Sequence, residues 1–291
     1  MNRGRSRISS RQLGALALSA AAVPVFRCCC RFSWSCVLPG GVGAAALLSC
    51  LTAVGNRRRG AERPAWLAGL CLPLLAAGAL WAAWESSFAF PETAGNGLAA
   101  AMVLLLSLWA AALGPAAAGR CAGILLWITG ALYGIVLLFS LPELRTDWLR
   151  PAGEAGDVLR CAGALLTPAA ALLLAPSLGE DQRLPHWPWW AEALSAAAAA
   201  VVTGGILSPA LAREPESFRT LARGVSVLGV IRRFEALVNG AMLISGFSLC
   251  VLYLTAADSL TEALFTRKRG ASFRAKPSKI FLKKCKKSVD K

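Results

Sequence analysis

Residues 121–141 read CAGILLWITGALYGIVLLFSL and contain no charged side chain. A helix of this length rises about 30 Å, which is the thickness of the hydrocarbon core of a bilayer. Apolar residues occupy every face of this helix, whereas a helix with one side in water would show a single stripe at 3.6-residue spacing. Residues 98–113, LAAAMVLLLSLWAAAL, have the same character. Both stretches therefore predict membrane-spanning helices.

Similar windows recur along the whole chain, and charged residues, 16% of the 291, gather between them. The pattern predicts an all-α fold, a polytopic transmembrane helical bundle of about eight spans within residues 1–265. The first span is the weakest, because Pro24 and Arg27 shorten it. The expected spans lie near residues 12–26, 35–54, 65–84, 97–114, 121–141, 161–178, 191–208 and 235–257.

Basic residues outside the windows predict the orientation. Residues 267–291 hold eleven of the 31 Lys and Arg residues, and residues 57–59 are three consecutive arginines. Basic flanks stay in the cytoplasm, so we expect both termini there, with residues 266–291 as a basic cytoplasmic tail near anionic lipid headgroups. No convincing signal-peptidase site follows the basic start, so the first window is expected to remain as an anchor. Nucleic acid is not an expected partner, because no aromatic residues interleave with the basic ones of the tail.

Residues 209–233 resist this scheme, because they carry five arginines and yet fall outside if eight spans are present. Phe218, Leu221, Val225 and Leu228 recur at intervals of three and four residues, opposite Arg219 and Arg223. This spacing predicts an amphipathic helix that lies on the membrane surface or caps a vestibule. If the first window does not span, every orientation is reversed.

Residue chemistry gives no sign of an enzyme. The sequence has no GxSxG hydrolase motif, HExxH metalloprotease motif, or glycine-rich nucleotide-binding motif between a predicted strand and a predicted helix. The Cys28, Cys29 and Cys30 triplet lacks metal-site spacing, so lipidation or packing is the expected role, and neither a metal nor a cofactor is predicted. Charged residues stand only at window ends: Glu192 opens the seventh span, and an interfacial ion pair is expected between Arg233 and Glu235 at the eighth.

Several short stretches match one family in order and spacing over roughly residues 8–258. They are ISSRQL (residues 8–13), PET (91–93), GR (119–120), LARGVS (221–226), RFEAL (233–237) and LYL (252–254). Together they resemble the spore germination permeases of the GerAB type, the B subunits of nutrient germinant receptors in spore-forming bacteria. That family belongs to the amino acid–polyamine–organocation (APC) transporter superfamily.

The resemblance implies an APC/LeuT-like fold of two inverted five-helix repeats, here with an incomplete second repeat, because family members have ten spans. It implies an integral membrane subunit of a germinant receptor that senses or passes a small germinant such as an amino acid. The expected partners are the A- and C-type receptor subunits, in the bacterial cytoplasmic or inner spore membrane. Two alternatives stay open: an amino-acid secondary transporter of vegetative cells, and a ligand-free structural or assembly membrane protein.

In folds of this type the ligand lies near the bilayer midplane at broken helices, because unwound turns expose N–H and C=O groups. In the first span the candidate break is Ala21, Ala22, Val23 and Pro24. In the sixth span it is Thr167 and Pro168. These six residues are the predicted substrate-binding positions, and the alternative for each proline is a kink without a ligand.

Overall fold

A computed structural model describes residues 8–57, 65–87, 96–149, 151, 153–174, 185–207, 220–222 and 235–274. These residues form helices and their connections, with no β-strand among them, and a helix lies over each of the eight predicted windows. In order they are α1 (Ser10–Arg31), α2 (Trp34–Arg57), α3 (Ala65–Ser87), α4 (Asn96–Ala112), α5 (Pro115–Ser140), α6 (Ala155–Leu165), α7 (Thr167–Leu174), α8 (Trp187–Ile206) and α10 (Glu235–Arg274). Two 3₁₀ turns, η1 (Leu141–Glu143) and η2 (Thr146–Trp148), follow α5.

Local sequence signals explain where several helices begin. α1 starts with a capping box, in which the Ser9 and Gln12 side chains each accept a hydrogen bond from the other residue's backbone N–H. α5 starts at Pro115 after Gly114, whose φ of 97° is a conformation that favours glycine. These local signals determine the residues at which α1 and α5 begin.

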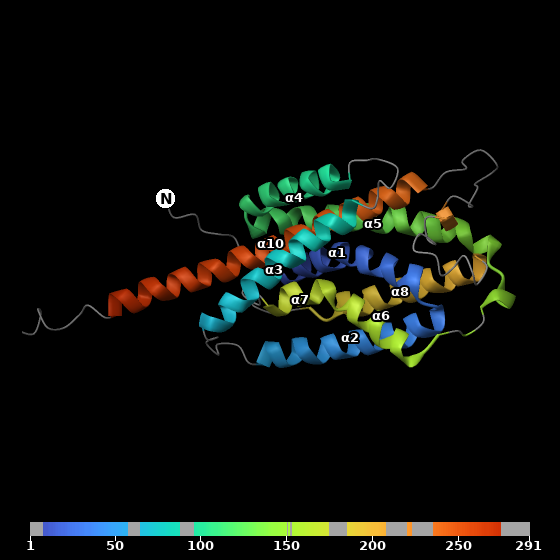
Figure 1. The fold of residues 1–291 in the computed structure, drawn as a ribbon, viewed down its shortest axis with the longest axis horizontal. Coiled ribbons are helices and arrows are strands. Elements are labelled where there is room, and N and C mark those ends of the chain that lie inside the picture. Colours follow the sequence, from blue (N-terminus) through green and yellow to red (C-terminus); the bar gives the residue numbers. More distant parts are fainter. Residues whose placement is uncertain are drawn as a thin grey trace, which may run out of the picture.

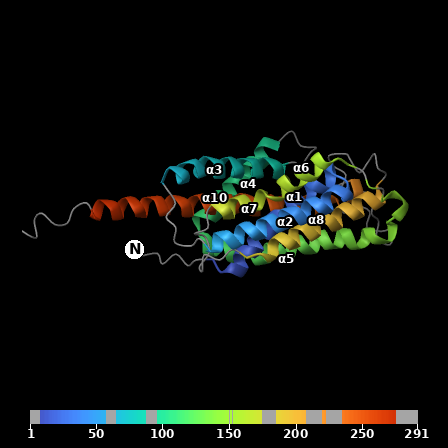
Figure 2. The same ribbon diagram turned by 90° about the horizontal axis from the view of Figure 1, so that it is seen from below.

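Consecutive spans run in opposite directions along the long axis of the bundle, with α6 and α7 together forming one pass (Figure 1; Figure 2). At one end Gly14 of α1 packs against the ring of Trp187, where α8 starts. At the other end the Arg145 N–H, after α5, donates to the Gly205 carbonyl in the last turn of α8 (2.8 Å). The start of α1 and the end of α10 therefore lie at the same end of the bundle.

α1 occupies the inside of the bundle, where it packs against α5, α8 and α10 and also touches α6 and α7. Leu13, Leu16, Ala20, Val23 and Phe26 are all buried. Since neighbouring helices surround α1, it needs less apolar surface than a helix that faces lipid. This position explains why the window with the weakest span signal still forms a central helix.

The outer helices expose apolar side chains: Trp127 on α5 is 82% exposed, and Leu194 on α8 is 73% exposed. Such a surface is unfavourable in water and expected in hydrocarbon. Five helical segments are long and apolar enough to cross a membrane, and the bent pair α6–α7 would add a sixth. They are Trp34–Val54, Gly69–Ser87, Pro115–Glu143, Trp187–Ile206 and Glu235–Glu262. The described part of the chain thus has the architecture of a helical membrane bundle.

The structure extends some predicted boundaries and leaves others open. α1 and the shorter α4 are not among the five candidate spans, so the number eight stays a prediction. α10 covers the predicted span 235–257 and continues as a helix to Arg274, and its 40 residues measure about 60 Å. Of residues 209–233 only 220–222 are described; they are helical, and Leu221 and Ala222 are buried. The rest of that segment, and the tail after residue 274, lie outside the described residues.

Candidate functional site

The sixth span is broken at Leu166, where α6 and α7 meet at an angle of 48°. Pro168 has no N–H to donate to the Ala164 carbonyl one turn before it. The Thr167 hydroxyl donates to that carbonyl instead (2.6 Å). The interruption predicted at Thr167 and Pro168 is therefore present, and a side chain replaces the missing backbone hydrogen bond.

α10 supports this break from the opposite side. The Tyr253 hydroxyl donates to the Thr167 carbonyl (2.8 Å), and the Tyr253 ring packs against Gly78 of α3. Leu165 and Pro168, on either side of the break, are buried. Two carbonyl groups at the break thus accept hydrogen bonds from side-chain hydroxyls in the interior of the bundle.

The interruption predicted in the first span is wrong, because α1 is continuous through Ala21, Ala22, Val23 and Pro24. Pro24 removes one backbone donor, and a proline inside a helix bends it more readily than it unwinds it when neighbours compensate. Beside Pro24 the Val23 N–H donates to the Ser245 hydroxyl of α10 (3.1 Å), a bond that joins α1 to α10 but does not replace the donor that Pro24 lacks. The sequence could not show this contact, which joins residues far apart in the chain.

The two proline segments nevertheless lie at the same height along the bundle. The Cys28 thiol of α1 lies 3.6 Å from the Cys161 carbonyl of α6, and the two helices are antiparallel. One turn back from Cys28 is Pro24, and one turn on from Cys161 is Leu165. Ala22 and Leu166 accordingly pack against the same buried cluster. The structure therefore brings together the two segments that the sequence singled out.

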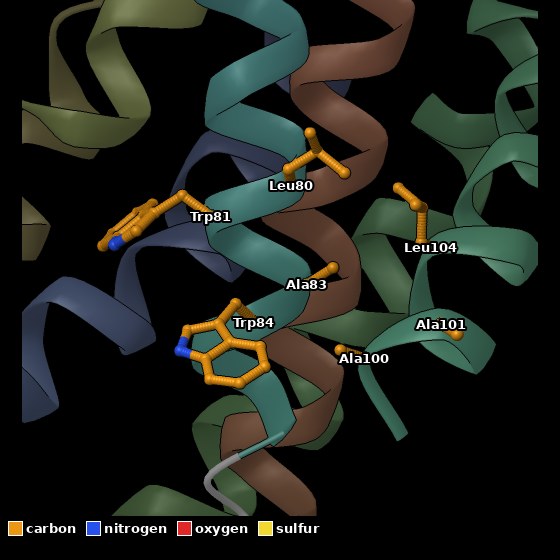
Figure 3. Close-up of a pocket in the computed structure, with 7 residues that line it drawn as sticks. All are labelled: Leu80, Trp81, Ala83, Trp84, Ala100, Ala101 and Leu104. Atoms are coloured by element: carbon orange, nitrogen blue, oxygen red, sulfur yellow. The ribbon is translucent and has the colours of Figure 1, made fainter. Parts of the chain in front are cut away.

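An open groove of about 470 Å³ lies between α3 and α4. In Figure 3, α3 contributes Leu80, Trp81, Ala83 and Trp84, and α4 contributes Ala100, Ala101 and Leu104. These side chains are apolar apart from the indole nitrogens, and none of the six predicted site residues is among them. The groove therefore lacks groups to recognise the charges of an amino acid.

Glu192 is a functional candidate whose burial the sequence analysis does not address. It is expected near the start of the seventh span, and it lies in the second turn of α8, where it is only 2% exposed. A sequence signal was available, because Glu192 follows Pro188 by four residues and precedes Ala196 by four, on the face that α8 buries. That spacing places the carboxyl inside the bundle.

The remaining predicted positions yield little chemistry. Among the described residues no group of three or more His, Cys, Asp and Glu side chains could hold a metal ion. The side chains of Cys29 and Cys30 lie outside the described part, as does Arg233, so its expected ion pair with Glu235 stays a prediction.

No protein-family model matches the chain, and no curated protein matches its sequence.

Proposed function

We propose that this chain is an integral membrane subunit of a spore germinant receptor, which senses or passes a small germinant such as an amino acid. Two features support the proposal: the ordered resemblance over residues 8–258, and a bundle whose described helices include five of spanning length and composition. In this proposal the chain lies in the inner spore membrane with A- and C-type receptor subunits as partners.

The observation that carries the proposal is the broken span α6–α7 set against residues 21–24 of α1. The carbonyls of Ala164 and Thr167 accept from the hydroxyls of Thr167 and Tyr253. The ammonium group of an amino acid is a donor of the same kind and can replace either hydroxyl. Because the surrounding side chains are buried, binding would require α7 to move relative to α1 or α10.

Spores that carry single substitutions test this site. We expect Thr167→Val and Pro24→Ala to weaken the germination response to a panel of amino acids, because both change the proline region. Trp148→Ala is the control, since Trp148 lies in η2 at the end of the bundle and stacks under Arg145 (5.0 Å). Immunoblots of spore membranes must show equal amounts of each variant. Equal responses of all three variants would remove the proposed site.

Two further measurements separate the alternatives. A vegetative transporter predicts net amino-acid uptake by proteoliposomes that contain the purified chain, whereas a receptor subunit predicts no net flux. A ligand-free assembly protein predicts that no amino acid raises the unfolding temperature in detergent, because stabilisation requires a ligand that binds the folded state. Stabilisation without uptake is the result expected for a receptor subunit.

A further inference from the structure

Glu192 is a carboxyl group without an evident role in the packing of the bundle. Its side chain is 2% exposed, and Oε1 has no hydrogen-bond partner among the described residues. Its neighbours on the same face of α8 are Trp189, Ala193 and Ala196, which are buried and mostly small. No ion pair joins Glu192 to a residue in the described part of the chain.

Thr129 on α5 lies at the same height. The Tyr133 hydroxyl of α5 donates to the Ser195 carbonyl of α8 (3.3 Å), and the two helices run in the same direction. One turn back along each helix are Thr129 and Glu192. Thr129 is 4% exposed, and its hydroxyl also has no partner among the described residues.

This hydroxyl differs from most others inside the helices. Ser140, Ser195, Ser248 and Thr255 each donate to a carbonyl three or four residues before them. Thr129 makes no such bond to the described residues, although a carbonyl lies one turn back along α5. Two buried polar atoms without partners therefore occur at one height on neighbouring helices.

The described charged groups on the elements around α8 lie near the ends of those elements. α8 packs against α1, α2, α5 and η2. Their described titratable side chains, with the histidine that precedes α8, are Arg11, Cys28, Cys36, Cys50, Arg120, Cys121, Tyr133, Asp147 and His186. The cations Arg11 and Arg120 are exposed, in the first turn of α1 and the second turn of α5, and His186 is exposed and hydrogen-bonded to Thr52 (2.7 Å). Arg27, Arg31 and Arg57 belong to α1 and α2, and their side chains lie outside the described part.

An unpaired carboxylate inside a membrane bundle is strongly unfavourable, whereas the protonated acid is neutral. We propose that Glu192 is a proton-binding site, with its carboxyl group neutral while α8 packs against α1 and α5. Loss of the proton leaves a charge that needs water or a cation, so release favours a state in which α8 separates from these helices. This inference needs only the membrane-embedded fold and stands independently of the germinant proposal.

Infrared spectroscopy of the full chain in lipid nanodiscs tests the site directly, because a carboxylic acid and a carboxylate absorb at different frequencies. At neutral pH the wild-type protein should show a carboxylic-acid band. Glu192→Gln should lose this band and still fold, since glutamine is neutral and similar in shape. Glu192→Asp should keep an acid band at a changed frequency, and Glu143→Gln, at an exposed position in η1, should leave the wild-type band unchanged.

Stability against pH provides a second readout. If the folded state holds a proton that the unfolded state releases, folding takes up a proton and stability falls as pH rises. The unfolding equilibrium constant of the wild type should then rise about tenfold per pH unit relative to that of Glu192→Gln, between pH 5 and the pH at which the folded carboxyl ionises. An unchanged acid band in Glu192→Gln, no acid band in the wild type, or parallel pH profiles would overturn the proposal.

Discussion

At the scale of single residues, hydroxyl groups form hydrogen bonds with backbone groups beside both prolines. Thr167 donates to the carbonyl that Pro168 leaves without its helical partner, whereas Ser245 accepts the N–H of the residue before Pro24 and supplies no donor. The two proline regions differ in shape, because α6–α7 bends sharply near Pro168 whereas α1 stays continuous through Pro24. The hydroxyl beside Pro168 belongs to Thr167 of the bent segment itself, and the hydroxyl beside Pro24 comes from Ser245 of α10. The first region is therefore stabilised by a local hydrogen bond and the second by a contact with another helix.

Thr167→Val should lower the stability of the bundle by about 1–3 kcal/mol, because it leaves the Ala164 carbonyl inside the bundle without a donor. Thr167→Ser keeps the hydroxyl and is the matched control. The measurement is the unfolding midpoint of the purified protein in detergent, followed by circular dichroism. Equal midpoints for the valine and serine variants would show that the 2.6 Å hydrogen bond contributes nothing.

The two tyrosines of the chain offer a matched pair for a second prediction. Tyr253→Phe removes a 2.8 Å hydrogen bond to Thr167 and should cost about 0.5–1.5 kcal/mol. Tyr133→Phe removes a longer one, 3.3 Å, to Ser195 and should cost less. Unfolding midpoints of both variants in the same detergent check the order. A larger loss for Tyr133→Phe would contradict the role assigned to Tyr253 in supporting the break.

At the scale of elements, α3 and α10 form the most extensive helix pair of the bundle. Their contact depends on glycine, because a Cβ on Gly246 would collide with the backbone and side chain of Ser86, and one on Gly78 would meet the Tyr253 ring at 2.6 Å. Small residues of this kind let transmembrane helices approach closely. Substitutions at the two glycines therefore test helix packing without a change of charge.

Gly246→Ala should destabilise the protein by about 1–3 kcal/mol. The new methyl group would meet the Cβ and Cα atoms of Ser86, so the backbone of α3 would have to move away from α10. Gly240→Ala on the same helix is the control, since a Cβ there would meet its nearest neighbour, Leu132, at 4.0 Å. Both variants carry the same change in helix propensity, so the difference between their unfolding midpoints isolates the packing effect. A loss of stability in Gly240→Ala as large as in Gly246→Ala would refute the proposed contact.

Elements were predictable where length and apolar character alone determine them. Helices lie over all eight windows, because a stretch such as residues 121–141 can bury its backbone polar groups in lipid only as a helix. The end of α10 was not predictable from charge, since Lys and Arg are good helix formers and do not stop a helix. The contact of α1 with Ser245 joins residues far apart in the chain, and the burial of Glu192 depends on which neighbours pack around α8. Both are tertiary contacts that a single sequence does not display.

At the scale of the whole molecule, the alternating helix directions and the exposed apolar surface support each other. A chain that crosses the bilayer back and forth places successive connections on opposite sides, and the bundle has this arrangement (Figure 1). α8 is the clearest test, because it is a candidate span of 20 residues and its two ends have well-defined contacts. His186 precedes its start, while Thr146, in η2, lies near its other end.

The direction of α8 through the bundle predicts that these two positions face opposite sides of the membrane (Figure 1). The basic flanks of the chain predict that the side of His186 is the cytoplasm. In a variant without the ten native cysteines, Thr146→Cys should react in intact cells with a thiol reagent that cannot cross membranes. His186→Cys should react only after the membrane is permeabilised, and the cysteine-free protein should not react at all. Reaction of both positions in intact cells would mean that α8 does not cross the bilayer. The reversed pattern would instead place the start of α8 outside, as expected if the first window does not span.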